Sequence, residues 1–398
     1  MVITHLKLKN WRNFRQAEMD LARVSYIIGP NASGKSNLLD VFRFLRDICK
    51  PDGGGLQKAV KDRGSITKLR CLHHRTDSEV RIEVTLADGF GDDAATWKYV
   101  LGFKGKGAER SLITTEEVWR SGKKILSRPQ AAEQEDPMLL TETHLEQTLA
   151  NRDFRELVEA FSDITYLHLV PQLLKYGEQI GGHRLEDDPF GQGFLERLAK
   201  TTKKTRDARL KRIQAALSVA VPQFKELRFE KDDMGHPHLQ ALYEHHRPNA
   251  GWQGEEHFSD GTLRLLGMLW SLLDGGGLLL LEEPELSLHQ AVVEQTPAMI
   301  DRVQRGRKPK RQVLISTHSQ ALLDNPGIDP RGVAVLEPSR EGTTVRAVDE
   351  IEAQGLDAGL SVAEVVLPRT RPKGIEQLGP ERSLYALRQP GTHAPSDR

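Results

Sequence analysis

The sequence predicts an α/β fold, and three of its segments carry the prediction. Residues 24–28 (Val-Ser-Tyr-Ile-Ile) have the composition of a buried strand, and residues 37–45 have helical periodicity. Four consecutive leucines at 278–281 indicate a strand that is buried on both faces of a sheet. Residues 312–319 contain another apolar run, which predicts a further buried strand. Buried strands that alternate with helices are typical of α/β proteins.

A glycine-rich loop with the spacing G-x-x-x-x-G-K-[ST] connects the first of these strands to the helix. The loop and the residue after it are Gly29, Pro30, Asn31, Ala32, Ser33, Gly34, Lys35, Ser36 and Asn37. In this spacing, backbone N–H groups wrap a polyphosphate, the lysine reaches the β- and γ-phosphates, and the serine hydroxyl binds Mg²⁺. A strand, a glycine loop and a helix N-terminus together make the anion site that the motif requires. The chain is therefore predicted to bind ATP or GTP.

Composition limits the other classes of function. The chain has 398 residues, enough for two or three domains of ordinary size, and its 56 Lys and Arg balance its 56 Asp and Glu. Contact with nucleic acid or an acidic membrane must therefore come from local patches. Cys49 and Cys71 lack metal-ligand spacing and suit a reducing cytosol.

The N-terminus and the most apolar stretch of the sequence favour a cytoplasmic location without membrane contact. The N-terminus alternates like a strand and has no signal-peptide run. Residues 263–281 are rich in Leu, Met and Trp, but Arg264, Asp274 and three glycines interrupt them. This stretch divides into an amphipathic helix, a turn and a buried strand, which argues against a membrane span.

Changes in periodicity divide the chain into four parts. Residues 1–130 are predicted to form an N-terminal lobe with the phosphate loop, and period-2 alternation over 79–128 indicates an antiparallel side sheet. Residues 131–250 have mostly helical periodicity, as in an insertion. Residues 251–367 return to the pattern of the core and form a C-terminal lobe. Residues 368–398 are rich in Pro, Arg, Gly and Ser, so we expect a disordered or partner-bound tail.

The leucine strand delivers two adjacent carboxylates, Glu282 and Glu283, at its C-terminal end. Open α/β sheets place their ligands at that edge. Successive strand residues point to opposite sides, so the two glutamates should have different roles. Glu282 takes the position that supports Mg²⁺ beside Ser36, and Glu283 takes the position that orients or activates the attacking water.

Two further polar positions flank core elements. His318 follows the strand within 312–319, where it is placed to hydrogen-bond a γ-phosphate and to sense its loss. Residues 258–266 begin a helix for which Ser259 or Asp260 is the candidate N-cap, about 20 residues ahead of the two glutamates. Taken alone, that helix start indicates only a cap.

The order of these motifs resembles the ABC-type ATPase heads of the RecF/SMC group. The matching strings are the phosphate loop, Ser-Asp-Gly-Thr at 259–262, Leu-Leu-Leu-Leu-Glu-Glu-Pro-Glu-Leu-Ser-Leu-His at 278–289, and Ser-Thr-His-Ser at 316–319. They are most similar to stand-alone bacterial AAA family ATPases that also form the ATPase half of OLD-type and Septu-type defence proteins. The resemblance covers residues 1 to about 367. It implies a P-loop NTPase with an ABC-type head that uses ATP and Mg²⁺ and releases ADP and phosphate.

The resemblance also implies a homodimer or higher oligomer with composite ATP sites. Arg12 and Asn13 match the family's opening turn, whose side chains approach the nucleotide. Ser259 and Gly261 match the signature that closes over the γ-phosphate bound by another subunit. Residues 286–289 match the loop that crosses the dimer interface.

The chain departs from the family pattern at three places. Glu282 stands where many relatives of the wider ABC class have Asp, so the metal geometry is expected to shift. The segment after the first helix has no convincing match to the family's glutamine, and the candidates to replace it are Arg63-Gly64-Ser65 and His73-His74. The tail lacks the acidic cluster of a metal-binding nuclease, so nuclease activity is not expected.

Two basic segments leave nucleic-acid contact open. Residues 203–212 place Lys and Arg on a predicted helix, where they could follow the phosphates of DNA or RNA, although a solvated helix face is more common. Residues 302–311 surround a Pro/Gly loop, for which an ordinary surface loop is the simpler interpretation.

The predicted function is ATP-dependent dimerisation and conformational switching in a DNA-associated or phage-defence process. One alternative is an ATP-gated scaffold that controls a separately encoded nuclease or toxin, and another is a RecF-like DNA repair ATPase. The motor of a membrane transporter is disfavoured by the long insertion and the RecF-like N-terminus. The sequence leaves the partner, the nucleic acid and the physiological trigger open.

Overall fold

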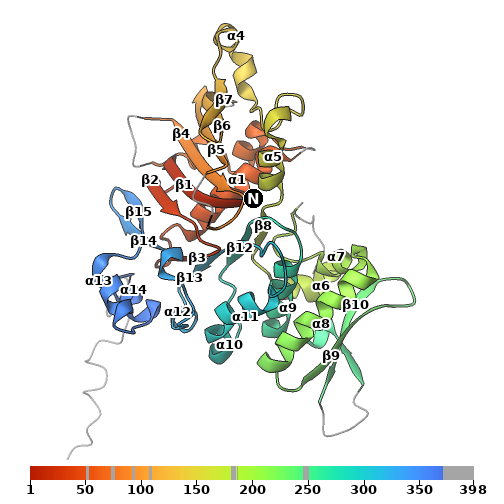
Figure 1. Cartoon of the computed structure of the whole chain (residues 1–398). Coiled ribbons are helices and arrows are strands. Elements are labelled where there is room, and N and C mark those ends of the chain that lie inside the picture. Colours follow the sequence, from red (N-terminus) through yellow and green to blue (C-terminus); the bar gives the residue numbers. More distant parts are fainter. Residues whose placement is uncertain are drawn as a thin grey trace, which may run out of the picture.

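The computed structural model places three β-sheets one above another, with helices between and around them (Figure 1). It describes residues 1–50, 53–72, 77–91, 95–106, 110–180, 185, 187–244 and 251–370. Of the predicted tail, positions 371–398 lie outside the described residues.

The central sheet holds the predicted nucleotide-binding strands. Its order is β15-β14-β3-β13-β12-β8, and all neighbours are parallel except the edge pair β14 and β15. The bounds are β3 (Val24–Ile28), β8 (Thr165–Leu167), β12 (Leu279–Glu282), β13 (Val313–Thr317), β14 (Val333–Ser339) and β15 (Gly342–Arg346). A parallel sheet with helices on both faces confirms the predicted α/β class.

The second sheet is antiparallel throughout, as the period-2 alternation predicts. Its order is β2-β1-β4-β5-β6-β7. The bounds are β1 (Val2–Trp11), β2 (Phe14–Asp20), β4 (Val80–Ala87), β5 (Trp97–Lys106), β6 (Arg110–Arg120) and β7 (Lys123–Arg128). A third, small sheet has the order β11-β10-β9 and consists of β9 (Phe224–Lys231), β10 (Pro237–Tyr243) and β11 (Trp252–Gly254).

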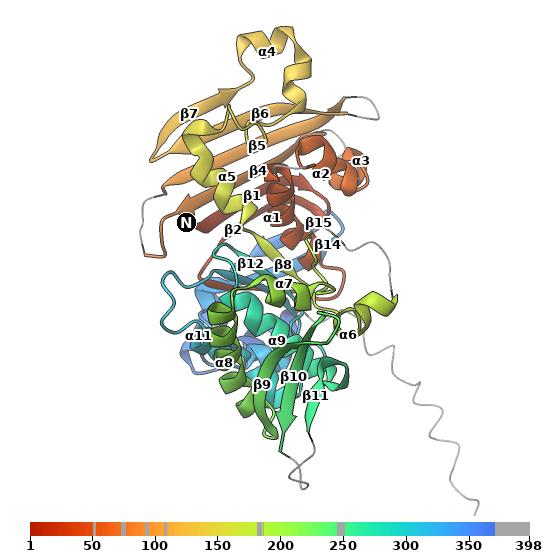
Figure 2. The same cartoon turned by 90° about the vertical axis from the view of Figure 1, so that its right-hand side faces the viewer.

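The helices fill the spaces that the sheets leave. α1 (Lys35–Cys49) and α5 (Arg155–Ser162) pack between the two large sheets, whereas α8 (Lys203–Ala220) and α9 (Asp260–Leu273) pack below the central sheet (Figure 2). The other α-helices are α2 (Leu56–Asp62), α3 (Ile66–Leu69), α4 (Ala131–Glu135), α6 (Pro171–Ile180), α7 (Phe194–Lys200), α10 (Gln290–Glu294), α11 (Thr296–Val303), α12 (Gln320–Leu323), α13 (Glu350–Asp357) and α14 (Val362–Thr370). Short 3₁₀ turns span Pro137–Thr141, Arg152–Phe154, Glu255–His257 and Pro330–Gly332.

The leucine run shows why β12 lies in the middle of the molecule. Leu278 and Leu280 pack into the apolar cluster shared with α1 and the antiparallel sheet, and Leu279 and Leu281 pack into the cluster on the opposite face. Each fully buried leucine contributes about 1.5–3 kcal/mol relative to an exposed one. A strand with this composition is stable only between two layers, and this fixes where its two glutamates emerge.

One strand of the central sheet comes from the block that the sequence predicts to be a helical insertion. β8 pairs in parallel with β12, so residues 165–167 belong to the nucleotide-binding sheet. A strand of three residues is too short to show a period of two, and its partner lies more than a hundred positions away. The block is therefore not a single insertion, although the division of the chain into lobes remains a prediction. Among the described residues, no helix is both long enough and apolar enough to cross a membrane.

Candidate functional site

The phosphate loop lies between β3 and α1 and has the backbone that its glycines allow. Ala32 and Gly34 have positive φ angles of 62° and 99°. A Cβ on Gly34 would overlap the side-chain amide of Asn13, so this position accepts only glycine. Lys35 is buried, with 7% of the residue exposed, and its ammonium folds back over the loop, where it donates to the carbonyls of Gly29 (2.9 Å) and Pro30 (3.2 Å).

Burial and nearby carboxylates act on the pKa of Lys35 in opposite directions. Burial lowers the pKa of the Lys35 ammonium, and the carboxylates of Glu283, Glu285 and Glu282 oppose that shift. All three acids come from the end of β12 and the turn after it, so the glutamate turn and the phosphate loop share one electrostatic environment.

Asn13 holds the phosphate loop and the start of α1 through hydrogen bonds. Its Nδ2 donates to the Ser33 carbonyl (2.9 Å) and to the Thr343 hydroxyl (2.8 Å), while its Oδ1 accepts from Asn37 Nδ2 (2.8 Å). The Thr343 hydroxyl also donates to the Ser33 carbonyl (2.9 Å). The predicted residue thus contacts the loop directly, and Thr343 joins it from a part of the chain 330 positions away.

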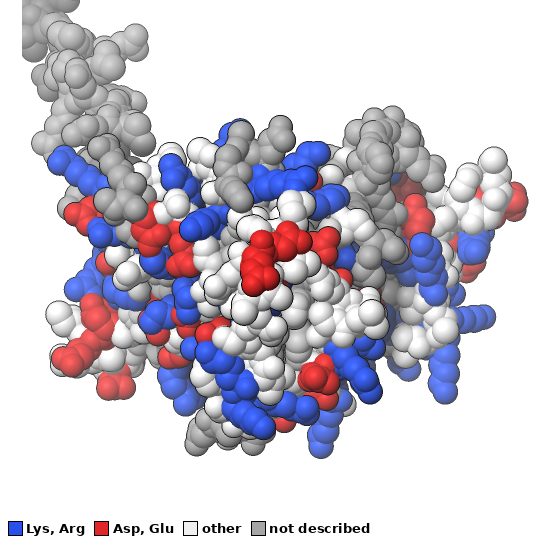
Figure 3. Space-filling view, turned by 90° about the horizontal axis from the view of Figure 1, so that it is seen from above, with Lys and Arg blue, Asp and Glu red and all other residues white. Residues whose placement is uncertain are grey.

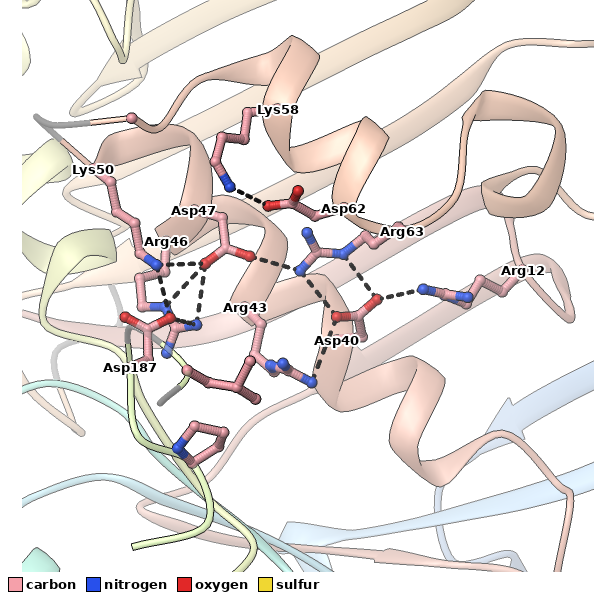
Figure 4. Close-up of a pocket in the computed structure, with 13 residues that line it drawn as sticks. Arg12, Asp40, Arg43, Arg46, Asp47, Lys50, Lys58, Asp62, Arg63 and Asp187 are labelled. Atoms are coloured by element: carbon pink, nitrogen blue, oxygen red, sulfur yellow. Dashed lines mark hydrogen bonds and ion pairs between the residues drawn. The ribbon is translucent and has the colours of Figure 1, made fainter. Parts of the chain in front are cut away.

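Arg12 points instead into a cavity of about 680 Å³ beside α1 (Figure 4). Its Nη2 lies 2.9 Å from Asp40 Oδ2, and Arg63 contacts both oxygens of the same carboxylate at 2.9 Å. Arg63 also contacts Asp47 at 2.9 Å. Arg63, one candidate to replace the glutamine, is therefore paired with two carboxylates of α1. The alternative candidates, at positions 73 and 74, lie outside the described residues. A contact of Arg12 with nucleotide remains a prediction.

The two glutamates have different partners, although Glu283, with a φ of 44°, lies beyond the end of β12, so strand alternation does not set its direction. Ser36 Oγ donates to Glu282 Oε1 at 2.5 Å. His318 Nδ1 lies 3.1 Å from Glu283 Oε1, and the Glu283 backbone N–H donates to the carbonyl of Ser316 on β13 (3.0 Å). The structure thus brings the loop serine, both carboxylates and the histidine to the carboxyl edge of one sheet. A hydroxyl and a carboxylate oxygen are ligands of the type that Mg²⁺ takes, so Ser36 and Glu282 fit a magnesium site.

Three residues near these carboxylates are absent from the sequence prediction. Tyr166 Oη donates to Glu282 Oε2 at 2.5 Å, and His168 Nδ1 donates to the Glu282 carbonyl at 3.3 Å. Both follow from the position of β8 beside β12, which no local pattern reveals. Glu285 is buried beside Thr317, whose hydroxyl donates to it at 2.5 Å, and burial raises the pKa of this carboxyl.

The predicted signature begins α9 at the surface. Ser259 is exposed and caps the helix, because its Oγ accepts from the Thr262 N–H (3.1 Å). Asp260 is held by the Lys175 ammonium (2.9 Å). A Cβ on Gly261 would lie 2.6 Å from the Ser287 carbonyl oxygen, so the glycine allows the signature to pack on the backbone of the 286–289 loop.

Some residues of each basic segment are used by the fold, whereas Lys203, Lys204, Lys211 and Arg212 are exposed. The Arg206 guanidinium stacks over Phe229 at 3.9 Å, and Arg209 pairs with Asp274 at 2.8 Å. In the second segment, Arg311 is buried and donates to the Gly277 carbonyl (2.8 Å). Seen from above, the face at the α4 end mixes basic and acidic side chains, in line with the balanced net charge (Figure 3).

A comparison with known protein families finds one family model that matches most of the chain. Residues 24–324, which include the loop, both glutamates and His318, match a family model described as "AAA domain, putative AbiEii toxin, Type IV TA system". The chain belongs to this family. It is therefore an AAA-type ATPase, and nucleotide binding follows from the family.

This AAA ATPase is similar in part to curated DNA replication and repair proteins named RecF. It is 33% identical over 94 residues to RecF of Roseiflexus castenholzii, covering 22% of this chain and 24% of that protein. It is 46% identical over 46 residues to RecF of Chlamydia abortus, covering 11% of this chain and 12% of that protein. The matches thus span a quarter or less of these relatives.

Solved SMC heads share the fold of this ATPase. A SmcHead bound to the C-winged helix domain of ScpA aligns with a TM-score of 0.53 and 14% identity, over 89% of this chain and 100% of that one. An Smc head with a coiled coil and joint from Pyrococcus yayanosii aligns with a TM-score of 0.50 and 12% identity, over 90% of this chain and 99% of that one. Together with the family match, this fold is that of an ABC-type ATPase head.

Proposed function

We propose that two copies of this chain bind ATP with Mg²⁺ in composite sites, hydrolyse it to ADP and phosphate, and switch conformation as they do so. The observation that carries the proposal is the convergence of Ser36, Glu282, Glu283 and His318 at one edge of the central sheet. Phosphoryl transfer depends on positioning and charge stabilisation, and these are what such a set of residues provides.

Each residue has a role that its contacts support. The Lys35 ammonium, which rests on two loop carbonyls, moves to the β- and γ-phosphates when nucleotide fills the loop. Glu283 accepts a hydrogen bond from the attacking water, and its partner His318 contacts the γ-phosphate. Ser36 and Glu282 would hold Mg²⁺, which neutralises phosphate charge when bound.

The second copy contributes the signature. Ser259 is exposed at the N-terminus of α9, a helix of 14 residues, where free N–H groups and the helix dipole favour an anion. Gly261 fixes this N-terminus against Ser287, so the signature and the 286–289 loop present one surface. A γ-phosphate held by one copy is a suitable anion for the surface of the other.

Sedimentation and ATPase assays test the composite site. Ser259→Arg should bind ATP almost normally but neither dimerise nor hydrolyse, because a bulky cation replaces a small hydroxyl at the interface. Glu283→Gln with saturating ATP provides the trapped-dimer reference, and Ser127→Arg, at an exposed position on β7, provides the control. A mixture of Ser259→Arg with Lys35→Ala should restore at most one intact site per heterodimer. A monomeric reference together with full activity of Ser259→Arg would refute the composite site.

The cellular process is proposed from the comparisons. The RecF relatives are named for DNA replication and repair, which favours a DNA-associated role. The family description names a toxin and a toxin–antitoxin system, which favours the alternative of an ATP-gated scaffold for a separate effector in defence. Salt-dependent binding of duplex DNA with ATP present would support the first role. Failure to bind DNA, with an effector encoded by a neighbouring gene, would support the second.

A further inference from the structure

The Glu282 carboxylate is held at both of its oxygens. Ser36 Oγ on α1 donates to Oε1, and Tyr166 Oη on β8 donates to Oε2, each at 2.5 Å. Tyr166 is a buried residue, 8% exposed overall, so little of the tyrosine is open to water. The carboxylate is thus fixed between the phosphate loop and the neighbouring strand.

The ring of Tyr166 is itself fixed from α1. The Arg43 guanidinium lies over the ring, 4.3 Å from its centroid, within the range of a cation–π contact. Arg43 lies two turns beyond Ser36 on α1, and its Nη1 is 3.8 Å from Asp40. The helix that carries the metal-binding serine therefore also holds the aromatic residue that contacts the metal-binding glutamate.

A glutamate that no second group restrains can rotate about three side-chain torsions and present its oxygens in many directions. A hydrogen bond to a fixed hydroxyl removes this freedom, and outer partners of this kind tune metal ligands. We propose that Tyr166 is a positioning residue that orients the Glu282 carboxylate for Mg²⁺ at Ser36. This rests on the proposed metal role of Glu282, and it gives β8 a function in the site.

The test measures metal binding rather than turnover. Free Mn²⁺ is followed by electron paramagnetic resonance during titration of the full chain with a non-hydrolysable ATP analogue. Tyr166→Phe removes only the hydroxyl and keeps the ring under Arg43, so we expect Mn²⁺ affinity to fall about 10-fold. Affinity for the analogue in the presence of EDTA should stay at the wild-type value, because no loop contact changes.

Two further variants make the result interpretable. Tyr99→Phe removes the same kind of buried hydrogen bond, from Tyr99 Oη to Glu116 at 3.0 Å, in the antiparallel sheet, and it should leave Mn²⁺ affinity unchanged. Glu282→Gln removes the proposed ligand charge and should weaken Mn²⁺ more than Tyr166→Phe does. In the Glu282→Gln background, Tyr166→Phe should have little further effect, because the tyrosine acts through the glutamate.

The outcomes separate this proposal from the one on which it rests. If Glu282→Gln weakens Mn²⁺ but Tyr166→Phe behaves like wild type or like Tyr99→Phe, the positioning role is overturned and the metal role of Glu282 stands. If Glu282→Gln binds Mn²⁺ like wild type, the metal role fails, and the positioning role fails with it.

Discussion

Gly261→Ala is expected to damage the proposed dimer interface without changing the phosphate loop of the same chain. The new Cβ would lie 2.6 Å from the Ser287 carbonyl oxygen, whereas ordinary contact begins at 3.4 Å. Ser287 has a φ of 63°, a conformation with little freedom to give way. Overpacking of this kind costs about 1–3 kcal/mol, and the helix propensity of alanine returns about 1 kcal/mol. The net effect is therefore a loss of up to about 2 kcal/mol, concentrated at the proposed interface.

The assay compares stability, ATP affinity and turnover. We expect the thermal midpoint to fall by a few degrees, since about 1 kcal/mol corresponds to roughly 2–4 °C in domains of 150–250 residues. ATP affinity should be unchanged by calorimetry, while ATPase activity and ATP-dependent dimerisation fall. Gly267→Ala is the comparison on the same helix: its Cβ would lie 2.1 Å from a Leu169 methyl group, the end of a side chain that can change rotamer, whereas the Gly261 Cβ would meet a backbone oxygen. Full ATPase activity and a raised midpoint in Gly261→Ala would refute this account of the contact.

Two other predictions address charge. Lys35→Ala should lower ATP affinity about 10- to 100-fold while the fold survives, because a hydrogen bond to a charged group contributes about 1.5–3 kcal/mol. Unchanged affinity by calorimetry with Mg²⁺ present would contradict the loop assignment. His238 donates to Glu255 (2.8 Å), and this hydrogen bond, with Asp232 nearby, raises the pKa of the imidazole above 6.5. The stabilising charge is fully present below that value and is lost as pH rises through the raised pKa, so His238→Gln should destabilise more at about pH 6 than at about pH 8 in denaturant titrations. An equal loss at both pH values would argue against the pair.

The parts of the site that could be predicted are those that local sequence determines. The phosphate loop follows from a strand, a glycine spacing and a helix in one continuous segment. The two glutamates follow from a leucine run whose burial on both faces is confirmed by its packing. A helix cap can be predicted from the residues of the first helical turn alone, and the hydrogen bond from the Thr262 N–H to Ser259 Oγ confirms Ser259 as the cap.

The rest of the site depends on pairings that no local pattern encodes. β8 has three residues, so neither its existence nor its place beside β12 could be predicted, and Tyr166 and His168 were missed with it. Thr343 reaches the loop from a distant edge strand. The direction of Arg12 depends on Asp40 and Arg63, which form their network only when α1, the β1–β2 turn and the loop after α2 have come together.

The central claim is that the glutamate turn beside the phosphate loop hydrolyses ATP, and the Glu283→Gln variant tests it most directly. Glutamine keeps the size of the side chain and an oxygen for His318, but it removes the carboxylate that orients the water. The account predicts ATP affinity close to wild type and single-turnover hydrolysis slower by a factor of about 10² or more. Hydrolysis at a rate near wild type would contradict it and would move the catalytic role away from Glu283.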